Sequence, residues 1–343
     1  MEGAGGLKKR MLCSVWAALL ALLLTGCAAK TIDEMYALPR RSARNHNLRS
    51  AIESAMEGRV YAAPISGVNL ESVQTADLNG DGKEEYLIFA KSTQTDALEV
   101  LLFSETSEDT YELWETISCK GSSFEQVQYA DVDDSPGCEL IVGTQLNEKV
   151  TKTVSIYSFA GSQAQKIKSM IYVKFLVCDL DENGRSELLI IQNGDGEYRN
   201  GVARLYAYED GNVTRSVEAW LSVAPEYIRR ITANRLSGGE AAVYVAGAAA
   251  DNSIITDILA LRDGVFTNVA QSSEFGHAMG LMNNHTVYAE DLDGDGILEL
   301  PALLSMMYNT TQQNLIRWFS VDIDGNETNK LYTFHNFDDG WYI

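Results

Sequence analysis

The 343-residue sequence has few basic residues and none of the common catalytic motifs. Lysine and arginine number 27, against 48 aspartates and glutamates, so the formal charge is −21. Such acidity argues against a nucleic-acid partner, because the phosphates of nucleic acid demand a basic surface. The chain also has no HxH or HExxH pair, no GxSxG sequence and no P-loop. These absences give no sign of an enzyme, and the acidity suits a soluble, cation-binding domain outside the cell.

Cysteine pairs and long apolar runs are also scarce. After Cys27 the chain has only Cys119, Cys138 and Cys178, and none of these has the CxxC spacing of a zinc site. In an exported protein Cys119 could pair with Cys138, which would leave one free thiol. Cys178 takes the place that alanine has in most copies of a repeat described below, so a small buried side chain is expected there. The apolar stretch 11–24 is shorter than the roughly 20 residues of a membrane-spanning helix.

The beginning of the chain has the pattern of a secretory signal peptide over residues 1–26. Lys8, Lys9 and Arg10 precede the apolar stretch, which is the usual order of such a peptide. The stretch ends in LTGC, which resembles the lipobox of bacterial lipoproteins. The resemblance implies cleavage before Cys27 and lipid attachment to Cys27. The protein would then be anchored at the outer face of the cell membrane, or in the periplasm or outer membrane of a cell with two membranes. An ordinary signal peptide with a chance cysteine is the alternative.

One pattern recurs along the chain: a short β-type run, a loop of about nine residues that ends at glutamate, and a second β-type run. The loops begin at Asp77, Asp131, Asp179 and Asp291. The double spacing before the last loop predicts a further copy near residue 234, where the sequence keeps the glycines but has lost the acids. Five copies at intervals of about 50 residues are typical of solenoids, propellers and arrays.

The segments between the loops predict an all-β protein. Each contains four short runs rich in Val, Ile, Leu, Tyr and Phe, separated by turn residues. A four-stranded meander cannot bury both faces alone, whereas radial stacking in a β-propeller buries both. We therefore expect a propeller of about five four-stranded blades over 67–343, with six or seven blades as the alternative. Each loop would join the last strand of one blade to the first of the next, and the run 68–76 would complete the blade that begins at residue 299.

These repeats resemble the FG-GAP/VCBS repeats of integrin-α-like β-propellers over roughly residues 68–335. The Dx[DN]xDGxxE loops are the specific part of the resemblance, and the FG…GAP strand motif is not legible. The resemblance implies a propeller fold and fits an exported lipoprotein, since many such propellers occur in bacterial surface proteins.

Residues 27–66 lie outside the repeats and are predicted to form a lipidated tether. Ala43, Leu48 and Ile52 follow a helical spacing, and Gly58 is a stop signal. We expect a short helix that packs on the propeller. The alternative is that this basic segment lies near anionic lipid.

Three loops carry the oxygen donors of a calcium site. Calcium prefers six to eight oxygen ligands and tolerates irregular geometry. We name the loops in chain order: loop 1 (77–85), loop 2 (131–139), loop 3 (179–187), loop 4 (near residue 234) and loop 5 (291–299). The predicted ligands are Asp77, Asn79, Asp81, the carbonyl of Lys83 and Glu85 in loop 1, Asp179, Asp181, Asn183, the carbonyl of Arg185 and Glu187 in loop 3, and Asp291, Asp293, Asp295, the carbonyl of Ile297 and Glu299 in loop 5.

The other two loops are poorer in ligands. Loop 2 keeps Asp131, Asp133 and Glu139 but has Ser135 and Pro136 at its turn, so metal binding there is left open. Loop 4 offers almost no ligands and is predicted to bind no metal. The sequence thus predicts two to three calcium sites. None is an EF-hand, because the closing glutamate comes at position 9 and not at position 12. The alternative for every loop is an acidic turn in which Asp and Asn cap their own backbone.

The function that follows from these features is a lipid-anchored, calcium-stabilised propeller that acts as a binding or surface-interaction module. Its partner would be an extracellular protein or glycan. The alternative is an extracellular propeller enzyme that acts on glycans. A pocket lined by unpaired acids and aromatic rings, away from the loops, would favour the enzyme.

Overall fold

The computed structural model describes residues 43–343 except for 108, 134, 147–150, 162, 195–199, 250–252, 272–286, 309–310, 337–339 and 343. The predicted signal peptide and Cys27 therefore lie outside the described residues. The chain separates into two compact units, Met1–Arg49 and Ser50–Ile343, and every strand belongs to the second. Within the described part of the chain, no helix combines the length and the apolar character needed to cross a membrane.

The predicted helix is confirmed as α3 (Ala43–Ala55). Ile52 on this helix is buried, and the Arg59 guanidinium donates a hydrogen bond of 2.7 Å to the Ala55 carbonyl. Strand β1 (Arg59–Tyr61) then pairs with the strand that follows loop 1. Residues 59–61, which the sequence analysis assigned to the tether, thus belong to the first sheet.

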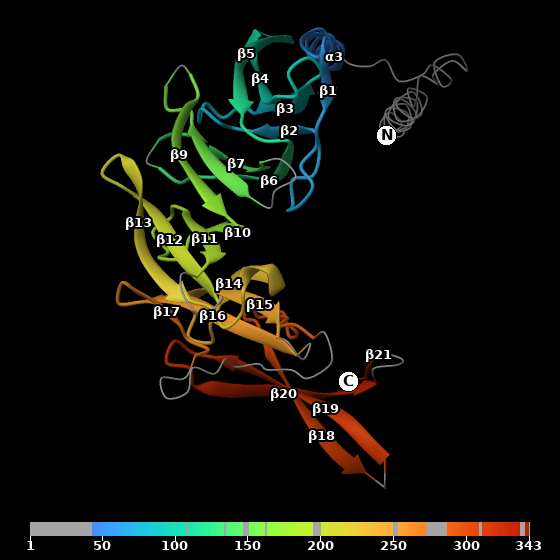
Figure 1. The fold of residues 1–343 in the computed structure, drawn as a ribbon, viewed down its shortest axis with the longest axis vertical. Coiled ribbons are helices and arrows are strands. Elements are labelled where there is room, and N and C mark those ends of the chain that lie inside the picture. The colour runs from blue at the N-terminus through green and yellow to red at the C-terminus, as the bar shows by residue number, and fades with distance from the viewer. Residues whose placement is uncertain are drawn as a thin grey trace, which may run out of the picture. The chain divides into compact units, whose positions relative to one another are not determined.

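The described residues beyond α3 form five antiparallel sheets, with the short 3₁₀ helix η1 (Pro225–Tyr227) between the third and fourth (Figure 1). Sheet 1 contains β1, β2 (Val73–Ala76), β3 (Glu85–Ser92), β4 (Leu98–Ser107) and β5 (Thr110–Cys119). Sheet 2 contains β6 (Ser123–Ala130), β7 (Glu139–Gln145), β8 (Lys152–Ser158) and β9 (Gln165–Tyr172). Sheet 3 contains β10 (Lys174–Cys178), β11 (Glu187–Asn193), β12 (Gly201–Glu209) and β13 (Asn212–Trp220).

The last two sheets repeat this arrangement. Sheet 4 contains β14 (Ile228–Arg235), β15 (Ala241–Ala248), β16 (Ile254–Arg262) and β17 (Val265–Asn268). Sheet 5 contains β18 (Leu300–Tyr308), β19 (Thr311–Val321), β20 (Glu327–Asn336) and β21 (Gly340–Tyr342). The prediction of an all-β fold is confirmed, and four of the five described sheets have the predicted four strands.

Sheets 2 to 5 are simple meanders, in which neighbouring strands are consecutive in the chain. Short turns between these strands explain the pattern. Asp210 and Gly211 connect β12 to β13 with φ angles of 49° and 81°, and Asp263 and Gly264 connect β16 to β17 with φ angles of 50° and 76°. Positive φ at both central residues is the property of the two-residue hairpin turn that favours Asp-Gly.

The predicted position of the acidic loops relative to the sheets is wrong. Loops 1 to 4 each connect two neighbouring strands of one sheet, and loop 5 lies between the bridged residues Glu290 and Glu299, directly before β18. The residues that pair across the loops are Ala76 with Glu85, Ala130 with Glu139, Cys178 with Glu187, and Glu290 with Glu299. The reason is that a loop of this length lets its flanking strands pair with each other directly, and strands adjacent in sequence usually pair.

The predicted closure by residues 68–76 is wrong for the same reason. Val73–Ala76 forms β2, which pairs with β3 in sheet 1, so this run does not complete the sheet that begins near residue 300. Sheet 1 therefore has both β1 and β2 along the same side of β3.

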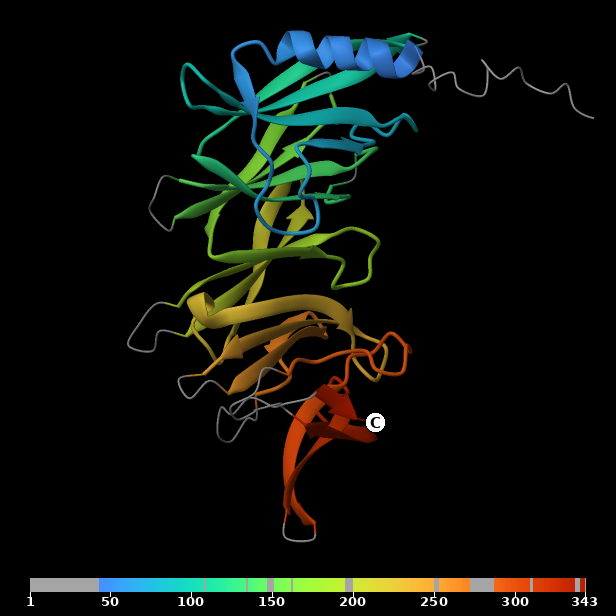
Figure 2. The same ribbon diagram turned by 90° about the vertical axis from the view of Figure 1, so that its right-hand side faces the viewer.

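Apolar side chains join each sheet to the next one in the chain, so that consecutive sheets lie side by side (Figure 1 and Figure 2). The Phe89 ring of sheet 1 meets the Phe124 ring of sheet 2 edge to face, with centroids 5.1 Å apart. Tyr172 of sheet 2 and Phe175 of sheet 3 repeat this contact at 5.0 Å. Among the described residues, no hydrophobic cluster contains side chains of both sheet 1 and sheet 5.

Candidate metal centres

Loops 1, 2, 3 and 5 share one hydrogen bond that closes them. In each loop the Oε2 atom of the final glutamate accepts the backbone N–H of the second loop residue. The donors are Leu78, Val132, Leu180 and Leu292, at 2.9, 2.7, 2.7 and 2.9 Å. The four glutamates are buried: Glu187 is the most exposed of them, at 3 %, and Glu299 is fully buried. This bond explains why the repeat ends on glutamate at the ninth position.

The leading aspartate and the glycine at the sixth position form a second shared element. The Oδ2 atoms of Asp77, Asp179 and Asp291 accept the N–H groups of Gly82, Gly184 and Gly296 at 3.0, 2.9 and 3.0 Å. All three glycines have φ between 81° and 90°, a region that side chains with a Cβ rarely adopt. The capping of the backbone by acidic side chains, proposed above as the alternative to metal, is thus present in these loops.

Loops 3 and 5 also bring three carboxylates together. Asp179, Asp181 and Glu187 each place one oxygen within 4.8 Å of the others, and Asp291, Asp293 and Glu299 do the same. These two triads could hold a metal ion. The Oε1 atom of Glu299 is buried and accepts no hydrogen bond, so the site has an oxygen that lacks a hydrogen-bond donor. An all-oxygen donor set of this kind fits a hard cation such as Ca²⁺ or Mg²⁺.

The other ligands predicted in loops 3 and 5 are turn residues in the structure. The Oδ1 atom of Asn183 accepts the N–H of Arg185 at 2.7 Å, and that of Asp295 accepts the N–H of Ile297 at 2.9 Å. Each of these side chains thus stabilises the turn of its own loop. The backbone carbonyls of residues 185 and 297 stay predicted ligands.

Loop 1 does not form a carboxylate triad with the groups that the structure describes. It has Asn79 where loops 3 and 5 have aspartate, and the Asn79 amide donates to Glu85 Oε1 at 2.9 Å. Asp81 accepts the N–H of Lys83 at 2.8 Å. The Asn79 amide therefore supplies a hydrogen bond to Glu85 in place of a third carboxylate. Loop 1, including the Lys83 carbonyl, stays a predicted metal site.

Two acids of loop 2 accept hydrogen bonds from hydroxyl groups. Asp133 is 5 % exposed and accepts the Ser158 hydroxyl at 2.8 Å, while Glu139 accepts the Ser135 hydroxyl at 3.3 Å. Ser158 lies on β8, outside the repeated loop, so the motif could not indicate it. In loop 4 the paired residues are Arg235 and Ala241, which makes the loop shorter than the others and leaves no acid at the positions of the triads.

Neighbouring loops contact one another in chain order. The carbonyl of Asp77 accepts the N–H of Cys138 at 3.1 Å, and the carbonyl of Asp131 accepts the N–H of Ser186 at 2.7 Å. The same two positions of the repeat are used in both contacts. The backbone carbonyl of the leading aspartate thus bonds directly to the next loop.

Loops 3, 4 and 5 continue this row. Arg235 of loop 4 forms an ion pair of 2.6 Å with Glu182 of loop 3 and a backbone bridge with Ile297 of loop 5. Close packing between loops 1 and 2 also explains why residue 137 is a glycine. Its φ is 96°, and an added Cβ would lie 2.4 Å from the Leu78 carbonyl oxygen.

The disulfide considered for Cys119 and Cys138 does not form, and all three described cysteines are free thiols. Cys119 is buried beside the Tyr157 hydroxyl, at 3.8 Å. The Cys138 thiol donates to the Asp77 carbonyl at 3.3 Å, as part of the contact between loops 1 and 2. Cys178 is partly buried at the end of β10.

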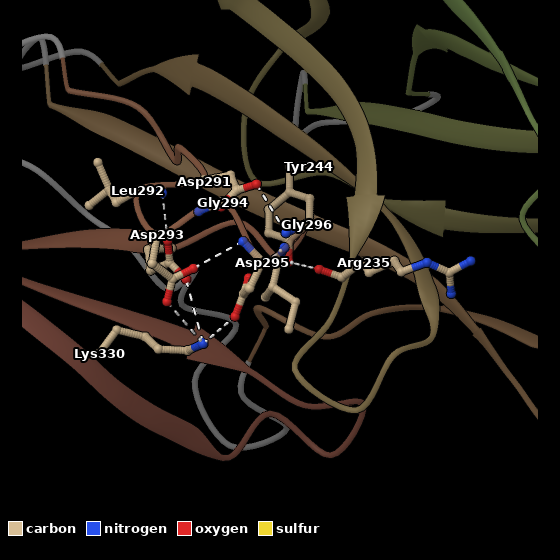
Figure 3. A network of polar contacts seen from close by, with 11 residues as sticks. Arg235, Tyr244, Asp291, Leu292, Asp293, Gly294, Asp295, Gly296 and Lys330 are labelled. Atoms are coloured by element: carbon tan, nitrogen blue, oxygen red, sulfur yellow. Dashed lines mark hydrogen bonds and ion pairs between the residues drawn. The ribbon is translucent and has the colours of Figure 1, made fainter. Parts of the chain in front are cut away.

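A lysine from another strand enters loop 5 (Figure 3). The Nζ atom of Lys330, on β20, lies 2.7 Å from Asp295 Oδ2, 3.7 Å from Asp293 Oδ2 and 3.9 Å from Glu299 Oε1. The hydrogen bond with Asp295 raises the pKa of Lys330 above its ordinary value and lowers the pKa of Asp295. Lys330 is distant from the loop in sequence, so the repeat gave no signal for it.

Burial changes the ionisation of the closing glutamates. It raises the pKa of Glu187 from 4.5 to about 7, against the opposing effect of the Leu180 N–H. Burial likewise raises the pKa of Glu85, Glu139 and Glu299. In metal-free protein, the ionised form of Glu187 is therefore disfavoured relative to the unfolded chain.

We expect the metal-free protein to lose stability as the pH rises from about 4.5 to about 7, because folded Glu187 binds a proton that the unfolded chain releases in this range. The contribution is complete below the lower pH and lost above the higher one. Thermal unfolding of metal-free wild type and Glu187→Gln at several pH values measures it. The variant should show a smaller loss over this range, and equal pH profiles would contradict the shift.

Two depressions are lined by described residues. One, of about 490 Å³, lies between loops 3, 4 and 5 and is lined by Asp179, Asn234, Arg235 and Asp295 among others. The other, of about 70 Å³, lies beside Thr144 in sheet 2. Neither of these two depressions is lined by an aromatic ring or by an acid from outside the loops.

No protein-family model matches the chain, and no curated protein matches it. Among solved structures it is similar to the exotype rhamnogalacturonan lyase YesX, with a TM-score of 0.34 and 11% identity over 81% of this chain and 67% of that one. It is also similar to the Bacillus licheniformis rhamnogalacturonan lyase PL11, with a TM-score of 0.34 and 13% identity over 81% of this chain and 66% of that one. The chain thus spans about two thirds of the length of these structures.

Proposed function

We propose that this protein is an exported, lipid-anchored binding module of the FG-GAP/VCBS type whose β-sheets are stabilised by calcium. The observation that carries the proposal is the pair of carboxylate triads at equivalent positions of loops 3 and 5. The acidic repeat and the lipobox-like LTGC sequence support export and anchoring.

Calcium is the cation that these loops suit best. The triads are made of carboxylates alone, and Ca²⁺ accepts 6–8 oxygens at 2.3–2.6 Å with irregular geometry. Mg²⁺ demands nearly ideal octahedral geometry and keeps several waters, so it gains less from a loop that offers several carboxylates and a carbonyl. Loops 3 and 5 would bind calcium through Asp179, Asp181 and Glu187 and through Asp291, Asp293 and Glu299, with loop 1 as a third, weaker site.

The propeller arrangement belongs to the same proposal. Repeated four-stranded meanders that pack against their neighbours in chain order are the units of a propeller, and this supports five blades. Contact between sheet 1 and sheet 5 would close the ring, by a route other than residues 68–76.

Calcium titration of the full chain by calorimetry tests the metal sites. We expect at least two sites with dissociation constants of roughly 10⁻⁴–10⁻³ M, the range of extracellular calcium modules. Glu187→Gln with Asp179→Ala should remove one site, and Glu299→Gln with Asp291→Ala should remove another. Asn234→Ala in loop 4 is the control and should remove none. A wild-type protein that binds no calcium would refute the proposal.

The lipid anchor predicts a separate result. Cys27→Ala should abolish partitioning of the protein into a detergent phase, while the exported variant keeps the melting temperature of the wild type. Cys27 precedes the first strand by more than 30 residues, so the substitution should not affect folding. Unchanged partitioning of the variant would show that Cys27 carries no lipid.

The partner of the module is proposed to be an extracellular protein or glycan. A screen of the calcium-loaded full chain against glycan and protein arrays would identify it. Binding that disappears in EDTA would connect the partner to the metal loops, because these loops line the depression between sheets 3, 4 and 5.

A further inference from the structure

Loops 3 and 5 have the same triad of carboxylates but different surroundings. In loop 5 the Lys330 ammonium lies within 4 Å of three carboxylates, at 2.7, 3.7 and 3.9 Å from Asp295, Asp293 and Glu299. In loop 3 no lysine or arginine of the described residues forms an ion pair with Asp179, Asp181 or Glu187. Their closest contacts are backbone N–H groups and the Asn183 amide.

A divalent cation and the Lys330 ammonium compete for the same oxygens. The triad oxygens of loop 5 lie within 4.8 Å of one another, and a calcium ion would lie about 2.3–2.6 Å from each. Such an ion would be only a few ångströms from Nζ in its present position, where two positive charges repel strongly. Lys330 must therefore leave before the ion can bind, and the ion pairs with Asp295 and Asp293 are lost.

The Glu299 oxygen shows that the ammonium does not satisfy the site completely. Glu299 is fully buried, and its Oε1 atom has no hydrogen-bond donor in the described structure. The nearest ammonium is 3.9 Å away, beyond the distance of a hydrogen bond. This buried oxygen is therefore available to a smaller cation held closer than the ammonium.

We propose that Lys330 is a tethered competitor for the cation site of loop 5. It makes loop 5 a weaker calcium site than loop 3, which fills first. When loop 5 fills, Lys330 is released from it, so the contact between β20 and loop 5 depends on calcium concentration. The proposal rests on calcium binding by these loops, as proposed above.

Lys330→Met removes the competing charge and keeps most of the side-chain length. Calcium titrations of the full chain would be made in an Asp179→Ala background, which reports loop 5, and in an Asp291→Ala background, which reports loop 3. We expect Lys330→Met to tighten calcium binding in loop 5 about tenfold and to leave loop 3 unchanged. Lys330→Arg keeps the charge and should behave as the parent. Lys91→Met, at an ion pair in sheet 1, is the matched control.

A second measurement uses the wild-type chain. Acetylation of Lys330 by an N-hydroxysuccinimide ester, followed by mass spectrometry, should be several-fold faster in calcium than in EDTA, whereas Lys91 should not change. The inference would be overturned if loop 5 bound calcium equally well with and without Lys330. It would also be overturned if the reactivity of Lys330 stayed constant as loop 5 filled. Either result would leave the proposed calcium sites intact. Absence of calcium binding in both loops of every variant would instead refute the proposed function.

Discussion

Removing calcium is expected to lower the melting temperature of this protein by several degrees. A site that binds only the folded state adds about RT ln(1 + [L]/Kd), or about 1.4 kcal/mol at a tenfold excess of calcium over Kd. The two triads would together add about 3 kcal/mol, a large share of the usual 5–15 kcal/mol of a folded domain. For domains of 150–250 residues each kcal/mol corresponds to roughly 2–4 °C, and a larger unit such as Ser50–Ile343 shifts by about 2 °C.

Removal of calcium should lower the stability of the protein and leave its secondary structure unchanged. Every loop closes between two paired backbone segments, and its turn is held by its own hydrogen bonds, such as that from the Gly296 N–H to Asp291 at 3.0 Å. Without metal these bonds remain, and the loop has no pair of helices to move. Circular dichroism at room temperature should therefore be nearly the same in calcium and in EDTA.

Substitutions in single loops distinguish the contribution of each loop to calcium stabilisation. Asp291→Ala with Asp295→Ala should remove the contribution of loop 5 to the difference in melting temperature between calcium and EDTA, and loop 3, the tighter site, should account for most of what remains. The difference is the informative quantity, because these substitutions also remove turn hydrogen bonds in the metal-free protein. Asn234→Ala in loop 4 should leave the difference intact. A wild-type melting curve that EDTA does not move would show that the acidic loops are only turns.

The strands and loops were predictable from the sequence because their signals are local. Apolar runs such as ELIVGTQ and ELLIIQN form β7 and β11, since the alternation of apolar runs with turn residues directly reflects strand length. The aspartates and glycines of the loops were predictable for the same reason, because each caps or turns the backbone within a few residues.

The assignment of strands to sheets was not predicted correctly. A repeat has no marked beginning, so its period fits equally well with loops inside a sheet or between sheets. The pairing of Ala76 with Glu85 decides this, and it depends on which strands hydrogen-bond and not on composition. The contacts of Lys330 with loop 5 and of Ser158 with loop 2 were missed because they come from other strands, through tertiary packing.

Sheet 4 has no acidic loop, and a buried carboxylate takes part in holding it to sheet 3. Asp257 on β16 is fully buried and accepts the Ser222 N–H at 2.7 Å, the Ser222 hydroxyl at 2.6 Å and the Asn268 amide at 2.8 Å. Ser222 follows β13 of sheet 3, so the carboxylate bridges the two sheets. Burial raises the pKa of Asp257, while the hydrogen bonds from Ser222 and Asn268 oppose this effect.

Asp257→Ala is expected to destabilise the protein by about 2–3 kcal/mol, because it removes hydrogen bonds to a charged group and leaves buried neutral donors without their acceptor. The Ser222 N–H would lose its acceptor, and the Nδ2 group of Asn268 would lose one of its two acceptors and keep the Trp220 carbonyl. Because loop 4 has no acidic triad, the loss should be equal in calcium and in EDTA, unlike that of the loop 5 variants. Chemical denaturation in both conditions measures it. Glu226→Ala, which removes an exposed acid nearby, should change stability by no more than about 0.5 kcal/mol. An Asp257→Ala protein as stable as the Glu226→Ala control would show that the bridge between sheets 3 and 4 contributes nothing.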